Sequence, residues 1–192
     1  MKMTRSFILA AFTALCSVLT AQDTSENLPF KNIPEYPNTF NEGTVAARLV
    51  DALGFRFYWA TEGLTKKDLD YKPNDDSRST IETIDHIYGL SKIIVNSTLQ
   101  KNNEQQKENL SYQELRQNTL KNLKKASDIL RQSQDISQFT IKFGSTEYPF
   151  WNQINGPISD AIWHCGQIAI NRRSSGNPIN AKVNHFLGQV SN

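Results

Sequence analysis

The chain of 192 residues carries 21 Lys and Arg against 19 Asp and Glu, and it contains two cysteines. A charge balance this close to neutral gives no electrostatic case for nucleic-acid binding, so we expect no nucleic-acid partner. The length is enough for one hydrophobic core of ordinary size.

The first 21 residues have the pattern of a secretory signal peptide. Lys2 and Arg5 precede an uncharged apolar run over residues 7–19, and Ala21 stands before a polar stretch. This pattern predicts cleavage after Ala21 and export to the periplasm or the medium. The run is shorter than a membrane-spanning helix needs, so we expect no stable membrane span.

The two cysteines differ in what they predict for the exported chain. Cys16 lies in the apolar run without the small preceding residue of a lipid-attachment site, which favours a soluble protein over a lipid-anchored one. Cleavage would leave Cys165 alone, which excludes an internal disulfide framework. Cleavage would also remove two of the 21 basic side chains and none of the 19 acidic ones, so the mature chain has 19 of each.

The mature chain begins with a predicted extended arm. Residues 22–43 are polar and contain three prolines. A first helix is expected from about Thr44 to Glu62, because apolar residues recur at helical spacing and Gly63 follows as a stop signal. The positions expected to face inward are Val45, Leu49, Leu53, Phe57 and Ala60. A short capped turn is expected at Thr65–Asp68.

Two capping boxes mark the starts of the next two helices. Ser79 and Glu82 begin a helix to about Leu99, and the box at residues 111–114 begins a third helix to about Ser133. The positions of the third helix expected to face inward are Leu115, Thr119, Leu123, Ala126 and Leu130.

A small hairpin and a last long helix complete the predicted fold. Residues 139–143 alternate apolar and polar, and Gly144 and Ser145 suit a two-residue turn before residues 146–150. The last helix either starts at Pro157 as its first residue or starts near Trp151 and bends at the proline. Gly176 and the proline two residues later predict its end. We therefore expect an all-α four-helix bundle with a small β-hairpin before the last long helix, as one domain over residues 44–192.

The last helix carries a candidate pair of metal ligands. Asp160 and His164 are four residues apart, which places their Cβ atoms roughly 5–6 Å apart on one helical face. They border an apolar stripe, so we expect them to point into the interior, where an uncompensated carboxylate is costly. His86 on the second helix is the candidate third ligand, because facing helices of a bundle can converge polar side chains on one ion.

The same residues also fit a protein without metal. His86 and His164 taken alone are more typical of buried histidines bonded to a neighbour, and Asp160 fits a partner of His164 or Arg172. Cys165 is expected to pack in the core rather than act as a nucleophile. Two interpretations remain open for each of two further groups of residues. The aromatic residues either line a pocket or belong to the core; they are Trp59, Tyr88 and Trp163. The basic residues either bind an anion or complement the helix dipole; they are Arg172 and Arg173. His185 is a reserve ligand.

Several segments in order resemble the DinB-like superfamily of metal-binding four-helix-bundle proteins. These segments, which run from about Thr44 to Gly176, are Gly54–Trp59 with Tyr71–Pro73, Ile84–Ile87, the hairpin, and His164–Ile168 with Arg172–Gly176. The resemblance implies one histidine ligand from the second helix and a His-x-x-x-His pair from the last helix. By position, His86 and His164 match the outer ligands, and Asp160 stands where the family has the middle histidine. The resemblance also implies that the protein forms a homodimer.

The implied ligand set suits zinc, nickel, iron or manganese. An open divalent site can act as a Lewis acid or activate a bound water, so we expect a metal-dependent hydrolase or transferase with an unknown small-molecule substrate, and no catalytic residue is assigned. Relatives that use low-molecular-weight thiols are a poor guide to the reaction, since such thiols are scarce where exported proteins work. The alternative function is a non-catalytic binding or stress-associated protein with a degenerate metal site.

Overall fold

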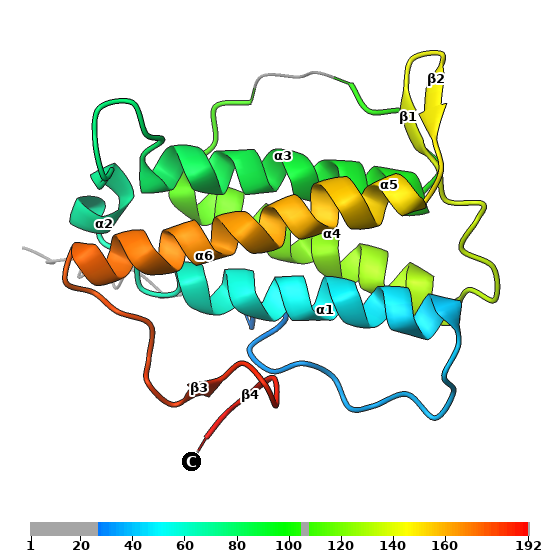
Figure 1. Ribbon diagram of the computed structural model, residues 1–192, viewed down its shortest axis with the longest axis horizontal. Coiled ribbons are helices and arrows are strands. Elements are labelled where there is room, and N and C mark those ends of the chain that lie inside the picture. The colour runs from blue at the N-terminus through cyan, green and yellow to red at the C-terminus, as the bar shows by residue number, and fades with distance from the viewer. Residues whose placement is uncertain (1–26, 105–107, 192) are drawn as a thin grey trace, which may run out of the picture.

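The computed structural model describes residues 27–104 and 108–191, which form a mostly helical fold with a small antiparallel hairpin (Figure 1). The predicted signal peptide lies outside the described residues, as does the first part of the predicted arm. No helix in the described part of the chain is both long and apolar enough to cross a membrane.

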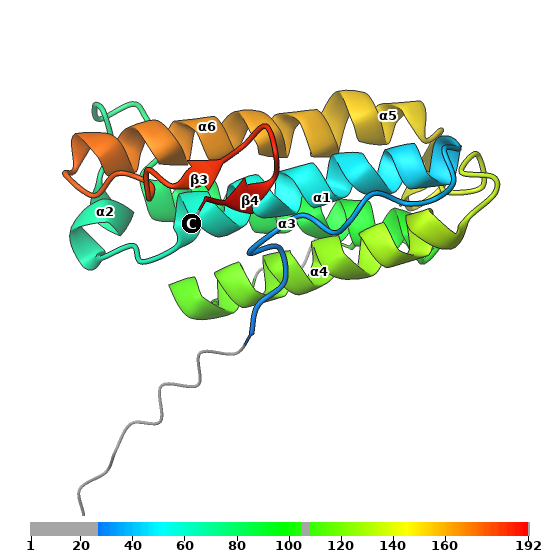
Figure 2. The same cartoon turned by 90° about the horizontal axis from the view of Figure 1, so that it is seen from below.

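Long helices make up the body of the fold. They are α1 (Glu42–Thr61), α3 (Thr80–Thr98), α4 (Tyr112–Gln132) and α6 (Ser159–Ser174). The short α2 (Lys66–Asp70) lies between α1 and α3 in the chain. Both α4 and α6 pack against α1 and α3, and they lie on opposite sides of that pair (Figures 1 and 2). Side chains from all four long helices meet in one core.

Local hydrogen bonds fix where the long helices begin. Ser79 N donates to Glu82 Oε2 at 2.7 Å at the start of α3, and the equivalent bond at Ser111 starts α4. Both predicted capping boxes are therefore confirmed. The predicted start of α1 at Thr44 is two residues too late, because the helix begins at Glu42 with Asn41 as its cap. Asn41 and Thr44 form a capping box in which the Thr44 hydroxyl takes the place of the usual glutamate.

The inward faces of the helices follow the predicted stripes closely. All five inward positions predicted for α4 are buried. On α1 the prediction for Val45 is wrong, because its side chain is 40% exposed while Ala46 and Ala47 are buried. Packing against α4 on one side and α6 on the other turns these two alanines towards the core, where their small side chains allow close contact.

Two pairs of short strands accompany the helices. The predicted hairpin is confirmed as β1 (Ile141–Phe143) and β2 (Thr146–Tyr148), with Gly144 at φ +59° in the turn. A second antiparallel pair, β3 (Val183–Asn184) and β4 (Gln189–Val190), was not predicted. It lies against the arm, where Ile33 N donates to Gly188 O at 2.7 Å.

The last helical run starts early and contains an irregular turn. It begins with α5 (Trp151–Gln153), passes through a π-helical turn at Ile154–Ile158, and continues as α6. Of the two predicted starts, the one near Trp151 is confirmed. Pro157 has no amide hydrogen to donate, and the wider π turn accommodates it within the helix. The run ends at Gly176, as predicted, with φ +98°.

Buried polar groups hold the end of α6 in place. Arg172 is only 4% exposed and donates through Nη1 to Trp59 O at 2.8 Å and Ala60 O at 3.1 Å, in the last turn of α1. Ser175 Oγ donates to the buried carboxylate of Asp68 in α2. These contacts fix α6 relative to α1 and α2, and so fix the position of the residues it carries.

Candidate metal centre

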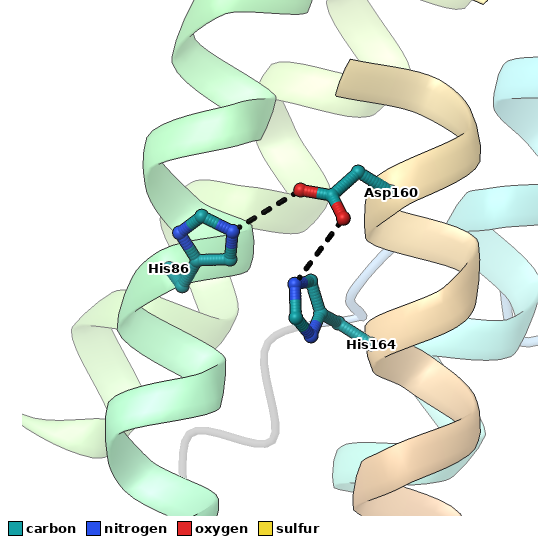
Figure 3. A group of neighbouring side chains, drawn as sticks. All are labelled: His86, Asp160 and His164. Atoms are coloured by element: carbon teal, nitrogen blue, oxygen red, sulfur yellow. Dashed lines mark hydrogen bonds and ion pairs between the residues drawn. The ribbon is translucent and has the colours of Figure 1, made fainter. Parts of the chain in front are cut away.

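The three predicted ligands come together between α3 and α6. Asp160 Oδ2 lies 3.2 Å from His86 Nε2, and Asp160 Oδ1 lies 3.3 Å from His164 Nε2 (Figure 3). One donor atom from each residue can be chosen so that all three lie within 4.8 Å of one another. The carboxylate therefore bridges the two imidazoles, with one oxygen towards each ring.

Helix packing explains why these side chains meet. His86 lies on α3 between the buried residues Thr83 and Leu90, which places it at the edge of the buried face of that helix. On α6, Asp160 and His164 are one turn apart on the side that faces α3 (Figure 3). The contact between α3 and α6 brings the two edges together.

The cluster is more accessible than expected. The exposed fractions of the side chains are 33% for His86, 45% for Asp160 and 12% for His164. The prediction that Asp160 points into the interior is therefore wrong, because Ala161 and Cys165 occupy the interior positions of α6. An ion held here would have a side open to solvent.

A neighbouring amide orients one imidazole. His164 Nδ1 lies 2.7 Å from Gln167 Oε1. An amide oxygen only accepts hydrogen bonds, so this contact places a hydrogen on Nδ1. Nε2, the atom that faces Asp160, then has its lone pair available for a metal ion. Gln167 was not predicted as part of the site, although its position three residues after His164 on the same helix was a usable signal.

The donor set fits a divalent metal ion. Two imidazole nitrogens and a carboxylate oxygen are ligands that zinc and other first-row transition metals accept. Donors around a tetrahedral zinc ion lie roughly 3.3 Å apart, given metal–ligand distances near 2.0–2.1 Å. The distances of 3.2 and 3.3 Å from Asp160 to the imidazoles involve different carboxylate oxygens, and one donor atom from each residue lies within 4.8 Å of the other two, so the side chains would have to draw closer together to hold one ion.

The structure also decides between earlier alternatives for neighbouring charged residues. Arg172 is not a partner of Asp160, because its guanidinium donates to backbone carbonyls and to Asn177. Burial lowers the pKa of Arg172, although Asp68 opposes that shift. Asp160 lies instead beside His164, with Oδ1 3.3 Å from Nε2. His185 contacts the Phe55 ring edge-on at 5.7 Å and is not part of the cluster.

The cysteine and the aromatic residues near the centre take structural positions. Cys165 is buried in the core, as predicted, and burial raises the pKa of its thiol to about 12. Trp59 and Tyr88 are also buried. Trp163 is 73% exposed on the outer face of α6, so it belongs neither to the core nor to the lining of a pocket at the centre.

A cavity of about 390 Å³ adjoins the cluster. His164 and Gln167 form part of its wall, together with Arg78 from the loop between α2 and α3. This cavity was not predicted, because the loop and α6 are far apart in the chain. The centre therefore has space beside it for a small molecule.

Comparison with known proteins adds no relative. No family model, curated protein or solved structure matches this chain. The resemblance to the DinB-like superfamily therefore depends on short segments between Thr44 and Gly176.

Proposed function

We propose that this chain is an exported, DinB-like four-helix-bundle protein that holds one divalent metal ion with His86, Asp160 and His164. The observation that carries the proposal is the convergence of these three side chains from two helices, with one donor atom from each within 4.8 Å of the other two. The ion is zinc, nickel, iron or manganese, since all four accept imidazole and carboxylate ligands.

The open side of the centre supports a catalytic role. When bound, an ion with three protein ligands and a free position supplies Lewis-acid chemistry or an activated water. Asp160 contributes one negative charge to the centre, and Gln167 orients the imidazole of His164. The cavity beside His164 provides space for a substrate. We infer a metal-dependent hydrolase or transferase that acts on a small molecule.

Metal content tests this proposal directly. Mature protein purified without chelator and without nickel resin should retain nearly one equivalent of divalent metal by elemental analysis. His86→Ala and His164→Ala should each abolish retention, because two remaining protein ligands compete poorly with water. His185→Ala is the matched control, since this histidine lies outside the cluster, and it should retain the metal.

A failure of this experiment would also be clear. If the native protein contains no metal and added metal leaves its melting temperature unchanged, native-state binding is absent. The observation that favours the alternative is that Asp160 already lies within hydrogen-bonding distance of both imidazoles. The protein would then be a non-catalytic binding or stress-associated bundle whose three side chains form a polar cluster.

We also propose that the protein forms a homodimer through the outer face of the last helical run. Trp151 and Trp163 are each 73% exposed. They are twelve residues apart in the chain, and the extra residue of the π turn brings them to about the same side of the run. A solution mass equal to two chains for the native protein, and to one chain for Trp163→Ser, would support this. A monomeric native mass would contradict it.

A further inference from the structure

The cavity beside the metal centre is lined both by a residue of that centre, His164, and by an arginine, Arg78. Its wall includes Pro73 and Arg78 from the loop between α2 and α3, and His164, Gln167 and Ile170 from α6. A molecule in this cavity would contact the imidazole of His164 and the guanidinium of Arg78 together. Pro73 and Ile170 add apolar surface to this wall, and the polar residues Ser77, Thr83 and Asn171 also line it.

Arg78 has its hydrogen-bonding groups available. It is exposed, and within residues 27–104 and 108–191 no hydrogen bond or ion pair involves its side chain. Arg78 interacts electrostatically with the carboxylate of Glu82. That carboxylate caps the start of α3, where it accepts hydrogen bonds from Ser79 N at 2.7 Å and from Ser79 Oγ at 2.9 Å. Arg78 can therefore bind a ligand without breaking an existing contact.

We propose that the cavity binds a small organic carboxylate, which places its carboxylate on Arg78 and its other end at the metal centre. This inference rests on the proposed metal-binding function. A guanidinium presents two parallel N–H donors that match the two oxygens of a carboxylate. The apolar side chains in the wall of the cavity, Pro73 and Ile170, suit a short aliphatic segment of the ligand.

The local charges favour a carboxylate over a phosphate monoester. Arg78 is the cation in the wall of the cavity, and Asp75 and Asp76 lie on the same loop. Lys72, the other cation of this loop, lies 3.6 Å from Asp75. A monoanion balances the charge of Arg78, whereas a dianionic phosphate would carry one negative charge that no side chain in the wall of the cavity balances.

Hydroxamates that differ only at the far end test this inference. A hydroxamate binds the metal, so the metal-loaded protein is titrated with two matched pairs. These are the monohydroxamate of adipate against hexanohydroxamate, and the monohydroxamate of succinate against butyrohydroxamate. We expect the carboxylated member of at least one pair to bind about fivefold more tightly, which is the gain typical of a partly exposed ion pair.

Substitutions assign that preference to a residue. Arg78→Gln should remove the preference for the carboxylated hydroxamate and leave the affinity for the uncharged hydroxamates unchanged. Arg78→Lys should retain part of the preference, because the positive charge remains but the two parallel N–H donors of the guanidinium are lost. Arg173→Gln is the matched control, because Arg173 is exposed in the last turn of α6 and does not line the cavity. It should keep the full preference.

The outcomes separate this inference from the proposed function. If the protein binds metal but the matched hydroxamates bind equally, or if the preference survives in Arg78→Gln, the carboxylate site is overturned and the metal centre stands. If the metal-loaded protein binds no hydroxamate, the cavity does not lead to the metal, and the inference again fails. If the protein binds no metal at all, the proposed function is refuted. The elemental analysis gives this result before any hydroxamate is added.

Discussion

His164 Nδ1 and Gln167 Oε1 lie 2.7 Å apart on successive turns of α6. This contact fixes the orientation of one predicted ligand, so Gln167→Ala should weaken metal binding by about 10–100-fold. Gln167→Glu keeps an acceptor at this position and should bind at least as well as the native protein. Competition titration against a chromophoric chelator measures both. Gln113→Ala, at an exposed position on α4, should have no effect.

Asp160 determines the charge of the centre and bridges the two imidazoles. Asp160→Ala should weaken metal binding, because it removes one ligand and the only negative charge of the cluster. Asp160→His should preserve or tighten binding, since it restores the His-x-x-x-His pair that the family resemblance implies. Calorimetric titration with zinc distinguishes these results. Equal affinities for Asp160→Ala and the native protein would show that the carboxylate is not a ligand.

The buried carboxylate of Asp68 should make stability depend on pH. Burial raises the pKa of Asp68, but hydrogen bonds from Ser175, Asn177 and Thr65 outweigh burial, and the pKa lies far below its ordinary range. The folded state then binds fewer protons than the unfolded state as the pH falls below about 4, so stability is present above that pH and is lost below it.

The contribution of Asp68 is measured by urea unfolding at a series of pH values. Native protein should lose stability steeply below about pH 4, and Asp68→Asn should show a shallower loss over the same window. At neutral pH Asp68→Ala should cost about 2–4 kcal/mol, because it leaves several buried donors without an acceptor. Asp70→Asn is the control, since Asp70 makes an exposed ion pair with Lys66. An identical pH slope in Asp68→Asn would contradict the assignment.

The proposed export of the protein predicts where the mature chain begins. N-terminal sequencing of material recovered from the periplasm or the medium should begin at Gln22, directly after Ala21. Replacing residues within the apolar run 7–19 by charged ones should retain the chain inside the cell, because the run would no longer be recognised as a signal peptide. An exported protein with Met1 intact, or with a lipid on Cys16, would contradict the prediction.

The features that were predicted correctly are those that depend on neighbouring residues in the chain. The capping boxes at Ser79 and Ser111 need only four residues each. The Asp160–His164 pair needs only helical spacing. The inward face of α4 is clear because its apolar residues repeat regularly on an otherwise polar helix.

The features that were missed depend on contacts between distant segments. Asp51 is fully buried and pairs with Arg131 at 2.6 Å, a contact across 80 residues that no local pattern indicates. The cavity at Arg78 forms only when the loop before α3 meets α6. The exposure of Asp160 was also missed, because its place relative to the interior is set by the packing of α6 on α3.

The π-helical turn at Ile154–Ile158 makes the last helix sensitive to the number of its residues. A π turn holds one residue more than the α-helical turn it replaces, and each residue advances a helix by about 100°. Deleting Gly156 would therefore give a regular helix in which Phe150 and Trp151 are rotated by about that angle relative to Asp160 and His164. Phe150 is now buried, so the deletion would leave the ligand spacing intact while disrupting the packing at the opposite end of the helix. In this segment the chain length itself is a structural constraint, independent of which side chains are present.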